Sequence, residues 1–438
     1  MAGITIFEFD ALTEAGPNGI ETAAMRRVPK PVFRWLEREA LRLAGGSQES
    51  WLRLTQRHGE RAVQVTHFVG VLQAPDGFRI EILPKTGRDT TPERARGLLV
   101  RMLKCLIAFR HIRARDADLD IVAMPLLEVF IQEFLQATNM VVKRGLRRDY
   151  VARQENLYVL RGKVLVDRQI ARNLVHRERF FTEHDEFLPD RAENRLIYTA
   201  LRTVLKMSRS HDNQRLARRL GAAFAGVPVA MNTEHDIRRI RLDRSMAHYK
   251  PALEWAKLIL RQLSPNPGPG RHPAPSLLFP MDALFEAYVA KHMARQLQTG
   301  WRIKAQASDR YLVMHMKQRW FRLKPDLLVK NRYGNRMVLD TKWKLLDAKK
   351  DNGREKYGLG QADFYQLYAY GRYYLGGRGD VVLIYPKTDS FSAPLPAFHV
   401  PDSEGMKLWV APFCLESAEL RFPEHESFSR LLRMESTA

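Results

Sequence analysis

Two aspartates and a lysine in residues 324–344, KPDLLVKNRYGNRMVLDTKWK, have a spacing that could serve chemistry. The apolar runs of this stretch flank NRYGN, whose Asn and Gly predict a hairpin turn. Asp326 and Asp340 lie symmetrically about Tyr333. A loop of three or five residues would place the two carboxylates opposite each other, with Cβ atoms roughly 5 Å apart, and a two- or four-residue loop would place them diagonally. Lys342 follows Asp340 by two residues, so strand alternation puts both on one face.

Two carboxylates held this close raise each other's pKa unless a cation neutralises them. Mg²⁺ suits such a site, because it takes a few carboxylate oxygens and leaves its other positions to water or phosphate. The ion would activate a water molecule and stabilise the charge of a pentacovalent phosphate. Lys342 would position or deprotonate that water, or offset the phosphate charge. The competing interpretation of these residues is a surface salt bridge.

The elements around this stretch predict a mixed α/β region over residues 276–438. Apolar periodicity predicts a helix, four strands, a second helix and a last strand, at 280–297, 301–307, 311–316, 326–330, 336–340, 356–375 and 380–386. The segment 264–275 holds five prolines and two glycines, which predicts a linker. A long surface loop within one domain is the alternative.

Two further regions precede the linker, which makes the predicted fold class a multidomain α+β protein. Residues 1–119 are predicted to be β-rich, with a turn at 74–77 and a helix from Pro92 through 109. Residues 120–263 are predicted to be mainly helical, with helices at 124–143 and 193–207 and a short β segment at 157–170.

The Pro-Asp…Asp-x-Lys pattern and the α-β-β-β-α-β order resemble the PD-(D/E)XK nuclease superfamily. This resemblance implies an acidic residue on the first helix, and Glu286 in ALFEAY fits. It also implies a Gln and a Tyr on the second helix. Gln366 and Tyr370 are four residues apart and share a helix face, but Gln361 and Tyr365 form a competing pair. For Tyr370, core packing is the favoured interpretation.

The charge of the chain indicates a polyanionic partner. Lys and Arg number 71 against 49 acidic residues, which gives a formal net charge of +22. Such a balance is typical of nucleic-acid binding, and less often of an anionic membrane surface or a solubilising surface. Residues 143–179 alone hold eleven Lys or Arg and four acidic residues. This stretch fits a phosphate-tracking surface, a dock for an acidic partner or a solvated helix face.

The remaining composition indicates the compartment. Two cysteines without metal-ligand spacing predict a reducing compartment and no disulfide framework. The N-terminus lacks the features of a signal peptide, and no apolar run is long enough to span a membrane. We therefore expect a cytoplasmic protein with no membrane partner.

Five stretches together resemble one narrower family, McrC, the nuclease subunit of the McrBC modification-dependent restriction system. They are GVLQAPDGFRIEILPKTG, LLFPMDALFEAYVA, KPDLLV, LDTKWK and QLYAY. The resemblance implies an N-terminal part that docks on and stimulates a hexameric AAA+ GTPase partner like McrB, and a C-terminal part that cuts DNA with Mg²⁺, or with Mn²⁺ in its place. The Pro/Gly linker departs from the compact pattern of the family.

Residue by residue, the resemblance implies that the catalytic residues are Asp326, Asp340, Lys342, Glu286 and Gln366. The predicted metal ligands are Asp326, Asp340 and Thr341. The chain has no G-x-x-x-x-G-K-(S/T) phosphate loop, so we expect it to bind no nucleotide itself.

The leading hypothesis is a DNA endonuclease subunit of a GTP-driven restriction complex that acts in antiviral defence. Two alternatives remain open at this point. One is a stand-alone repair or recombination nuclease, and the other is a non-catalytic DNA-binding regulator of an AAA+ hexamer.

Overall fold

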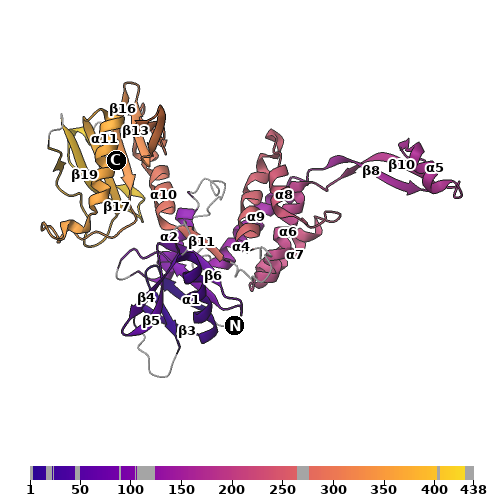
Figure 1. The fold of residues 1–438 in the computed structure, drawn as a ribbon, viewed down its shortest axis with the longest axis horizontal. Helices are drawn as coiled ribbons and strands as arrows, with labels where there is room; N and C mark the ends of the chain where they lie inside the picture. The colour runs from indigo at the N-terminus through magenta and orange to yellow at the C-terminus, as the bar shows by residue number, and fades with distance from the viewer. Residues whose placement is uncertain are drawn as a thin grey trace, which may run out of the picture. The chain divides into compact units, whose positions relative to one another are not determined.

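A computed structural model describes residues 3–15, 22, 24–44, 50–87, 90–103, 105, 124–263, 276–401 and 405–429. These residues form two compact units, whose elements Figure 1 labels. The first unit holds the described residues within 1–110 and 278–438, and the second holds those within 124–277. The N-terminal and C-terminal segments thus share one unit. The predicted linker 264–275 lies outside the described residues, and the division into regions at that point stays a prediction.

The N-terminal part of the first unit contains two four-stranded sheets, with strand orders β1-β7-β6-β11 and β3-β2-β5-β4. The turn at 74–77 forms as predicted, because the Gly77 amide donates to the Ala74 carbonyl across 2.8 Å. The strands are β1 Gly3–Phe7, β2 Ala11–Glu14, β3 Met25–Val28, β4 Leu52–Arg57, β5 Glu60–Val65, β6 Phe68–Gln73, β7 Arg79–Leu83 and β11 Ser276–Pro280.

Two helices accompany these sheets. Helix α1, Lys30–Ala44, packs against β2, β4 and β5 and was not predicted. Its buried residues follow helical spacing, and that periodicity in the sequence would have indicated it: Val32, Phe33, Trp35, Leu36 and Ala40. Helix α2, Pro92–Leu103, begins at the predicted proline. Residues 104 and 106–109 of that prediction lie outside the described residues.

The C-terminal part is built on a seven-stranded sheet of order β12-β15-β16-β17-β19-β18, with β20 paired to β19. Strands β12, β15 and β16 are antiparallel neighbours, whereas β16, β17 and β19 are parallel. The bounds are α10 Met281–Gln296, β12 Arg302–Ala305, β13 Arg310–His315, β14 Gln318–Leu323, β15 Leu327–Asn331, β16 Gly334–Thr341, α11 Gln361–Leu375, β17 Gly379–Pro386, β18 Phe398–His399, β19 Met406–Cys414, β20 Glu419–Leu420 and α12 Glu426–Ser429.

Every element predicted between residues 280 and 386 is present, although the helix predicted from 356 begins at Gln361 after a short 3-10 turn at Lys356–Gly358, and the structure adds β14, β18, β19, β20 and α12. Helices α10 and α11 cover opposite faces of the sheet. Val410 packs in the core under α11, whereas Phe413, three residues along β19, meets Phe285 of α10 at 6.0 Å between ring centroids. Residues an odd number apart on a strand point to opposite faces. The central strand β17 is buried at all but its first residue, as a parallel strand covered on both faces should be.

The second unit combines helices with a long β arm. Helices α4 and α6 match the two predicted helices, and α6 packs against α7, α8 and α9. Among the helices that the structure describes, none combines the length and apolar character that crossing a membrane requires. The helical elements are α4 Leu126–Lys143, α6 Ala192–Met207, α7 His211–Ala222, α8 Thr233–Arg239, η2 Arg244–Tyr249 and α9 Lys250–Leu263.

The arm comprises residues 149–188 and extends from the helices of its unit (Figure 1). Strands β8, Asp149–Leu157, and β10, Phe180–Leu188, pair antiparallel along their whole length. Strand β9, Lys163–Val164, and helix α5, Val166–Asn173, lie between them. The short β segment predicted at 157–170 is partly confirmed, because β9 lies within it, but residues 166–170 belong to α5 and the two long strands were not predicted. Strand β8 has no buried residue, so it lacks the apolar alternation that would reveal it, whereas β10 buries Phe181, Thr182 and His184.

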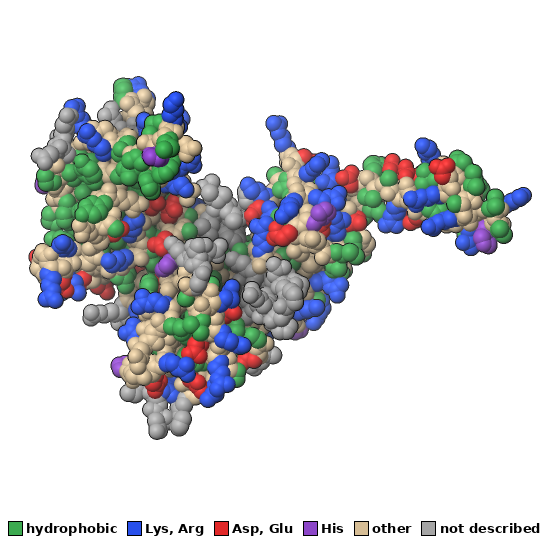
Figure 2. Space-filling model, viewed as in Figure 1, with side chains coloured by type: hydrophobic (Ala, Val, Ile, Leu, Met, Phe, Trp, Pro, Cys, Tyr) green, Lys and Arg blue, Asp and Glu red, His purple; other side chains and the backbone are tan. Residues whose placement is uncertain are grey.

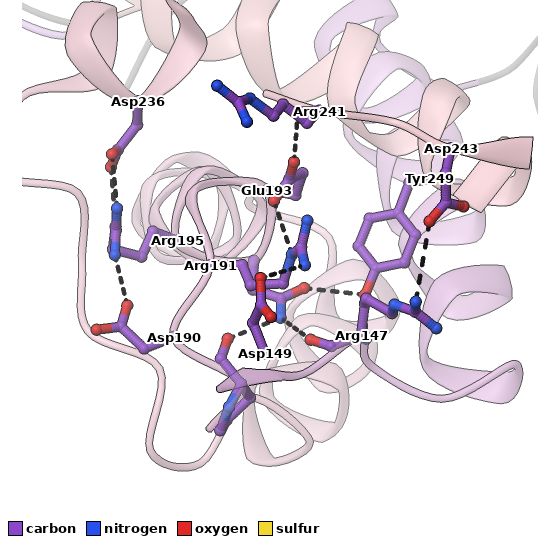
Figure 3. Close-up of polar contacts among 12 residues, drawn as sticks. Arg147, Asp149, Asp190, Arg191, Glu193, Arg195, Asp236, Arg241, Asp243 and Tyr249 are labelled. Carbon is purple, nitrogen blue, oxygen red and sulfur yellow. Dashed lines mark hydrogen bonds and ion pairs between the residues drawn. The ribbon is translucent and has the colours of Figure 1, made fainter. Parts of the chain in front are cut away.

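Hydrogen bonds tie both ends of the arm to one side chain (Figure 3). Asn194, near the start of α6, donates to the carbonyl of Arg147 across 2.9 Å and to that of Pro189 across 2.7 Å. These carbonyls lie just before β8 and just after β10. The Tyr249 hydroxyl donates to Asn194 Oδ1 across 2.9 Å and accepts from the Arg147 amide across 2.8 Å. Asn194 is fully buried, so these bonds fix the two ends of the arm relative to each other.

Ion pairs surround this clamp (Figure 3). Arg191 pairs with Asp149 of β8 at 2.9 Å. Arg195 binds Asp236 through two nitrogens, at 3.0 and 2.8 Å, and Asp190 at 2.6 Å. Such bidentate pairs fix geometry as well as charge. The root of the arm is therefore a cross-linked polar region.

Candidate active site

The β15–β16 hairpin sets Asp326 and Asp340 opposite each other. Leu327 pairs with Leu339, and the next position in this register puts Asp326 across from Asp340. The turn itself contains two residues and would alone have placed Asp326 opposite Leu339. A bulge adds one residue to β16 beyond the turn and restores the symmetric register. The predicted face-to-face placement thus arises from a short turn combined with a bulge.

Thr341 holds the carboxylate of Asp326 in place. Its backbone amide and its hydroxyl both donate to Asp326 Oδ2, across 2.7 and 2.6 Å. Both bonds use one oxygen, so Oδ1 is not taken by either of them. The Thr341 side chain is buried against this carboxylate, and what remains for a metal ion is its backbone carbonyl oxygen.

Lys342 belongs to a continuous series of hydrogen-bonded polar groups. Its Nζ is 2.8 Å from Asp340 Oδ2 and donates to Gln366 Oε1 across 3.1 Å. Gln366 in turn donates to the Tyr370 hydroxyl across 2.6 Å, and Tyr370 donates to the Lys324 carbonyl across 2.9 Å. This series of polar contacts runs from the end of β16 through α11 to the residues just before Asp326. It restricts where the ammonium group can lie.

The contacts of Glu286 and of the two candidate glutamines show where each lies relative to the site. The Glu286 carboxylate accepts from Gln306 Nε2 across 3.1 Å, and the Gln306 amide donates to the Asp326 carbonyl across 2.8 Å. Glu286 on α10 is thereby linked to the start of β15. Of the competing glutamines, Gln366 contacts Lys342, whereas Gln361 bonds to Tyr365.

Burial and mutual repulsion raise the pKa values of the acidic groups. Burial raises the pKa of Asp340, and the charge of Asp326 raises it further. Burial also raises the pKa of Asp326, although the two bonds from Thr341 oppose this. For Glu286, burial and then the charge of Asp326 raise the pKa to about 7. A cation close to these carboxyl groups would relieve this repulsion.

Burial and the neighbouring carboxylates act on the pKa of Lys342 in opposite directions. Burial is the largest single influence on the pKa of Lys342 and lowers it, but the charge and hydrogen bond of Asp340, together with the charges of Asp363 and Asp326, leave the pKa above its ordinary value. Lys342 is therefore an ammonium ion at neutral pH, which suits it to donate hydrogen bonds and to offset negative charge.

The donor set fits a magnesium ion that keeps part of its water shell. In the part of the chain that the structure describes, no three His, Cys, Asp or Glu side chains come together as a full ligand set. Asp326, Asp340 and the Thr341 carbonyl would supply three oxygens from two paired strands. Mg²⁺ binds through one or two carboxylates and completes its shell with water and phosphate oxygens.

Two residues near the site were missed in the sequence. Asp363 Oδ1 lies 4.0 Å from Lys342 Nζ, and its Oδ2 accepts from the Tyr385 hydroxyl across 3.4 Å. An Asp in the first turn of a helix is expected because it stabilises the helix dipole, so its position in the sequence does not indicate an additional contact with Lys342. Gln306 has no sequence pattern that marks it, because its contact with Glu286 depends on the packing of α10 beside β12.

Comparison with known proteins identifies the family. A family model described as McrBC 5-methylcytosine restriction system component matches residues 63–386. A search of the curated proteins found none that matches this chain. Among solved structures, a half-complex from a tetradecameric assembly of Thermococcus gammatolerans McrB AAA+ hexamers with bound McrC has a chain of 20% identity. That match covers 98% of each chain with a TM-score of 0.63.

A second match is the cryo-EM structure of the Thermococcus gammatolerans McrBC complex, at 24% identity and a TM-score of 0.49. It covers 67% of this chain and 88% of the other. At 20% identity, the first of these matches shows a shared fold alone. The family model covers most of the sequence, and it agrees with the membership predicted from the sequence motifs. The chain therefore belongs to the McrBC 5-methylcytosine restriction system component family.

Proposed function

We propose that this chain is the DNA endonuclease subunit of a GTP-dependent, modification-dependent restriction complex. The observation that carries the proposal is the contact of Lys342 Nζ with Asp340 Oδ2 at 2.8 Å, on a hairpin whose register sets Asp326 across from Asp340. The order α10, β12, β15, β16, α11, β17 supports a PD-(D/E)XK nuclease core.

Each side chain has a distinct part in phosphodiester hydrolysis. Mg²⁺, when bound, would supply Lewis-acid activation of water and stabilisation of phosphate charge. Asp326, Asp340 and the Thr341 carbonyl hold that ion. Lys342, kept protonated by Asp340, donates to the attacking water or to a phosphate oxygen, rather than acting as the base. Gln366 orients the ammonium through its 3.1 Å bond.

Glu286 has a pKa that suits proton exchange near neutral pH. Burial and the charge of Asp326 raise the pKa of its carboxyl group to about 7, so in the ion-free site it takes up or releases a proton near neutral pH, and a bound cation would lower this pKa. It lies on α10 and is held by Gln306. We assign it the role of a proton relay at the edge of the site, and not that of a metal ligand.

The arm is the surface that we assign to partner docking. One similar solved structure contains McrB AAA+ hexamers with bound McrC, which supports a McrB-like AAA+ partner for this chain, and we assign the GTPase activity of the complex to that partner. Large apolar side chains are exposed between the arm strands and on α5, and Figure 2 shows them beside Lys and Arg side chains along the arm. They are Tyr158, Val159, Leu160, Val166, Ile170, Leu174 and Val175. Contiguous exposed apolar surface of this kind marks a protein-protein interface.

Cleavage by an Asp340→Asn variant tests the proposal. The full chain is assembled with the partner GTPase, GTP, Mg²⁺ and DNA that contains 5-methylcytosine. We expect cleavage to fall at least about 100-fold, because the carboxylate that binds the ion and pairs Lys342 is lost. Stimulated GTP hydrolysis and the mass of the complex should stay as in wild type. Undiminished cleavage by this variant would contradict the proposal.

A further inference from the structure

Strands β13 and β14 form a hairpin, residues 310–323, that combines exposed apolar side chains with unopposed positive charge. The two strands pair only with each other among the described strands. Figure 2 shows hydrophobic side chains gathered beside Lys and Arg over this part of the first unit. The exposed apolar residues are Leu312, Val313, Met314, Met316, Trp320 and Phe321. The segment also contains Arg310, Lys317, Arg319 and Arg322 and no acidic residue.

Phe321 is held in an unfavourable backbone conformation. Its φ angle is +55°, a region that bulky residues rarely occupy. The register pairs Tyr311 with Arg322 and Val313 with Trp320, but skips Phe321. The Phe321 side chain is 67% exposed, so burial does not compensate for the strain. Strain that packing does not explain is a feature of functional positions.

The aromatic and basic side chains of the hairpin are arranged together. The Trp320 ring lies 4.7 Å from the His315 ring and 6.4 Å from that of Phe321, between centroids. The guanidinium groups of Arg319 and Arg322 lie over the Tyr311 ring, at 5.1 and 5.5 Å. Basic groups interleaved with accessible rings match the needs of a nucleic-acid strand, whose phosphates and bases alternate.

The base of the hairpin is fixed to the same helix that orients Lys342. The Tyr373 hydroxyl of α11 donates to the Leu312 carbonyl across 2.6 Å, and that of Tyr374 donates to the Leu323 carbonyl across 3.0 Å. Phe321 and Asp326 are five residues apart, which separates their Cα atoms by at most ~18 Å. That span corresponds to about five nucleotides at the 3.4 Å spacing of DNA.

We propose that the β13–β14 hairpin binds the DNA strand that enters the candidate active site. Phe321 and Trp320 stack on bases, and Arg319, Arg322 and Lys317 neutralise phosphates. The inference rests on the proposed nuclease function and adds a substrate-binding element to it. A second copy of the chain is a poorer occupant of this surface. A symmetric contact would set four cations of one hairpin against four of the other, with no acid between them.

The test measures DNA affinity in the full chain carrying Asp340→Asn, so that the DNA stays intact. Fluorescence anisotropy gives the Kd for single-stranded and duplex oligonucleotides, with 2-aminopurine as a reporter of stacking. Phe321→Gly should weaken binding about 5- to 100-fold and reduce the 2-aminopurine quenching, because one base loses its stacking ring while Trp320 remains. The same variant relieves a left-handed residue, so its Tm should equal or exceed that of the parent.

Phe9→Gly is the matched control. Phe9 is also exposed and also has a left-handed φ, +65°, but it lies in the N-terminal part between Glu8 and Asp10. Its DNA affinity should stay within a factor of about two of the parent. A second variant, Arg319→Ala with Arg322→Ala, should reduce the slope of log Kd against log salt by about two, because two phosphate contacts are lost.

Two results would overturn the inference. One is a Phe321→Gly variant that binds DNA and quenches 2-aminopurine like the parent. The other is a change in sedimentation of that variant with unchanged DNA affinity, which would assign the hairpin to contacts between copies. Either result leaves the cleavage test on Asp340 unaffected, so failure of the hairpin assignment and failure of the nuclease proposal are distinguishable.

Discussion

Trp343 donates its indole N–H to the buried carboxyl group of Glu8 across 2.8 Å. The same Glu8 oxygen accepts from the Lys85 amide, also at 2.8 Å. Trp343 directly follows Lys342, so the residue just after β1 is bonded to the segment just after β16, the strand that carries Asp340. The second carboxyl oxygen, Oε2, is buried and has no hydrogen-bond partner within the described ranges. Burial raises the pKa of Glu8 to about 8, so the group is protonated at neutral pH.

This contact predicts how stability depends on pH. Because the folded state binds the Glu8 proton more tightly than the unfolded state, whose pKa is about 4.5, stability should fall as pH rises from about 5 to 8. Glu8→Gln keeps the acceptor oxygen and removes the titration, so its stability should fall less over this range. Urea unfolding at pH 5, 6.5 and 8 measures both slopes.

Glu14→Gln is the control for this measurement. The bond from Lys30 lowers the pKa of Glu14, so this half-buried group stays ionised throughout the range and the variant should keep the wild-type slope. Equal slopes for wild type and Glu8→Gln would show that Glu8 is not protonated in the fold. Glu8→Ala should cost about 1–3 kcal/mol for each buried N–H left unpaired.

The root of the arm gives a second prediction. Asn194→Ala removes the side chain that joins the carbonyls before β8 and after β10, and it leaves the Tyr249 hydroxyl without an acceptor there. We expect faster amide hydrogen exchange at residues 147–150 and 188–191, by about 10-fold or more, since unpaired buried groups favour local opening. Stimulation of the partner GTPase should fall with it, because the arm no longer keeps a fixed direction.

Asn173→Ala supplies the comparison. Asn173 is also buried and bonded, to Asn156 at 2.9 Å, but it lies at the end of α5. Its loss should speed exchange around α5 and leave the root protected. If Asn194→Ala exchanges at the root like wild type, the clamp does not determine the position of the arm.

The sequence predicted the parts of the site that depend on local pattern. The period of two in β16 puts Asp340 and Lys342 together, and the helical spacing of α11 brings Gln366 to Tyr370. The bulge was not predictable, because the sequence shows neither the length of the turn nor the extra residue in β16 that compensates for it. The bond between Glu8 and Trp343 joins positions 335 residues apart, and the sequence around neither residue indicates it.

The same distant contacts change the interpretation of the segment 264–275. A linker there, with the N-terminal docking part that the McrC resemblance implies, suggests that a fragment ending at residue 263 could act alone on the partner. The described residues within 1–110 and 278–438 form one unit, and β11 completes the sheet of β1, β7 and β6. A fragment that ends at residue 263 would lose β11 and the partner of Glu8. We expect its N-terminal sheet to be destabilised.

The most direct test of the account is the single-turnover rate constant of DNA cleavage by the complex carrying Lys342→Ala. Lys350→Ala is the matched control, because Lys350 pairs with Glu355 on the surface at 3.0 Å. We predict that the Lys342 variant cleaves at least about 100-fold more slowly than wild type, since the charge held at Asp340 is lost from the reacting phosphate. The control should be unaffected, and GTP hydrolysis should be equal in all three. A Lys342→Ala rate constant within about twofold of wild type would contradict the assignment of this hairpin as the catalytic site.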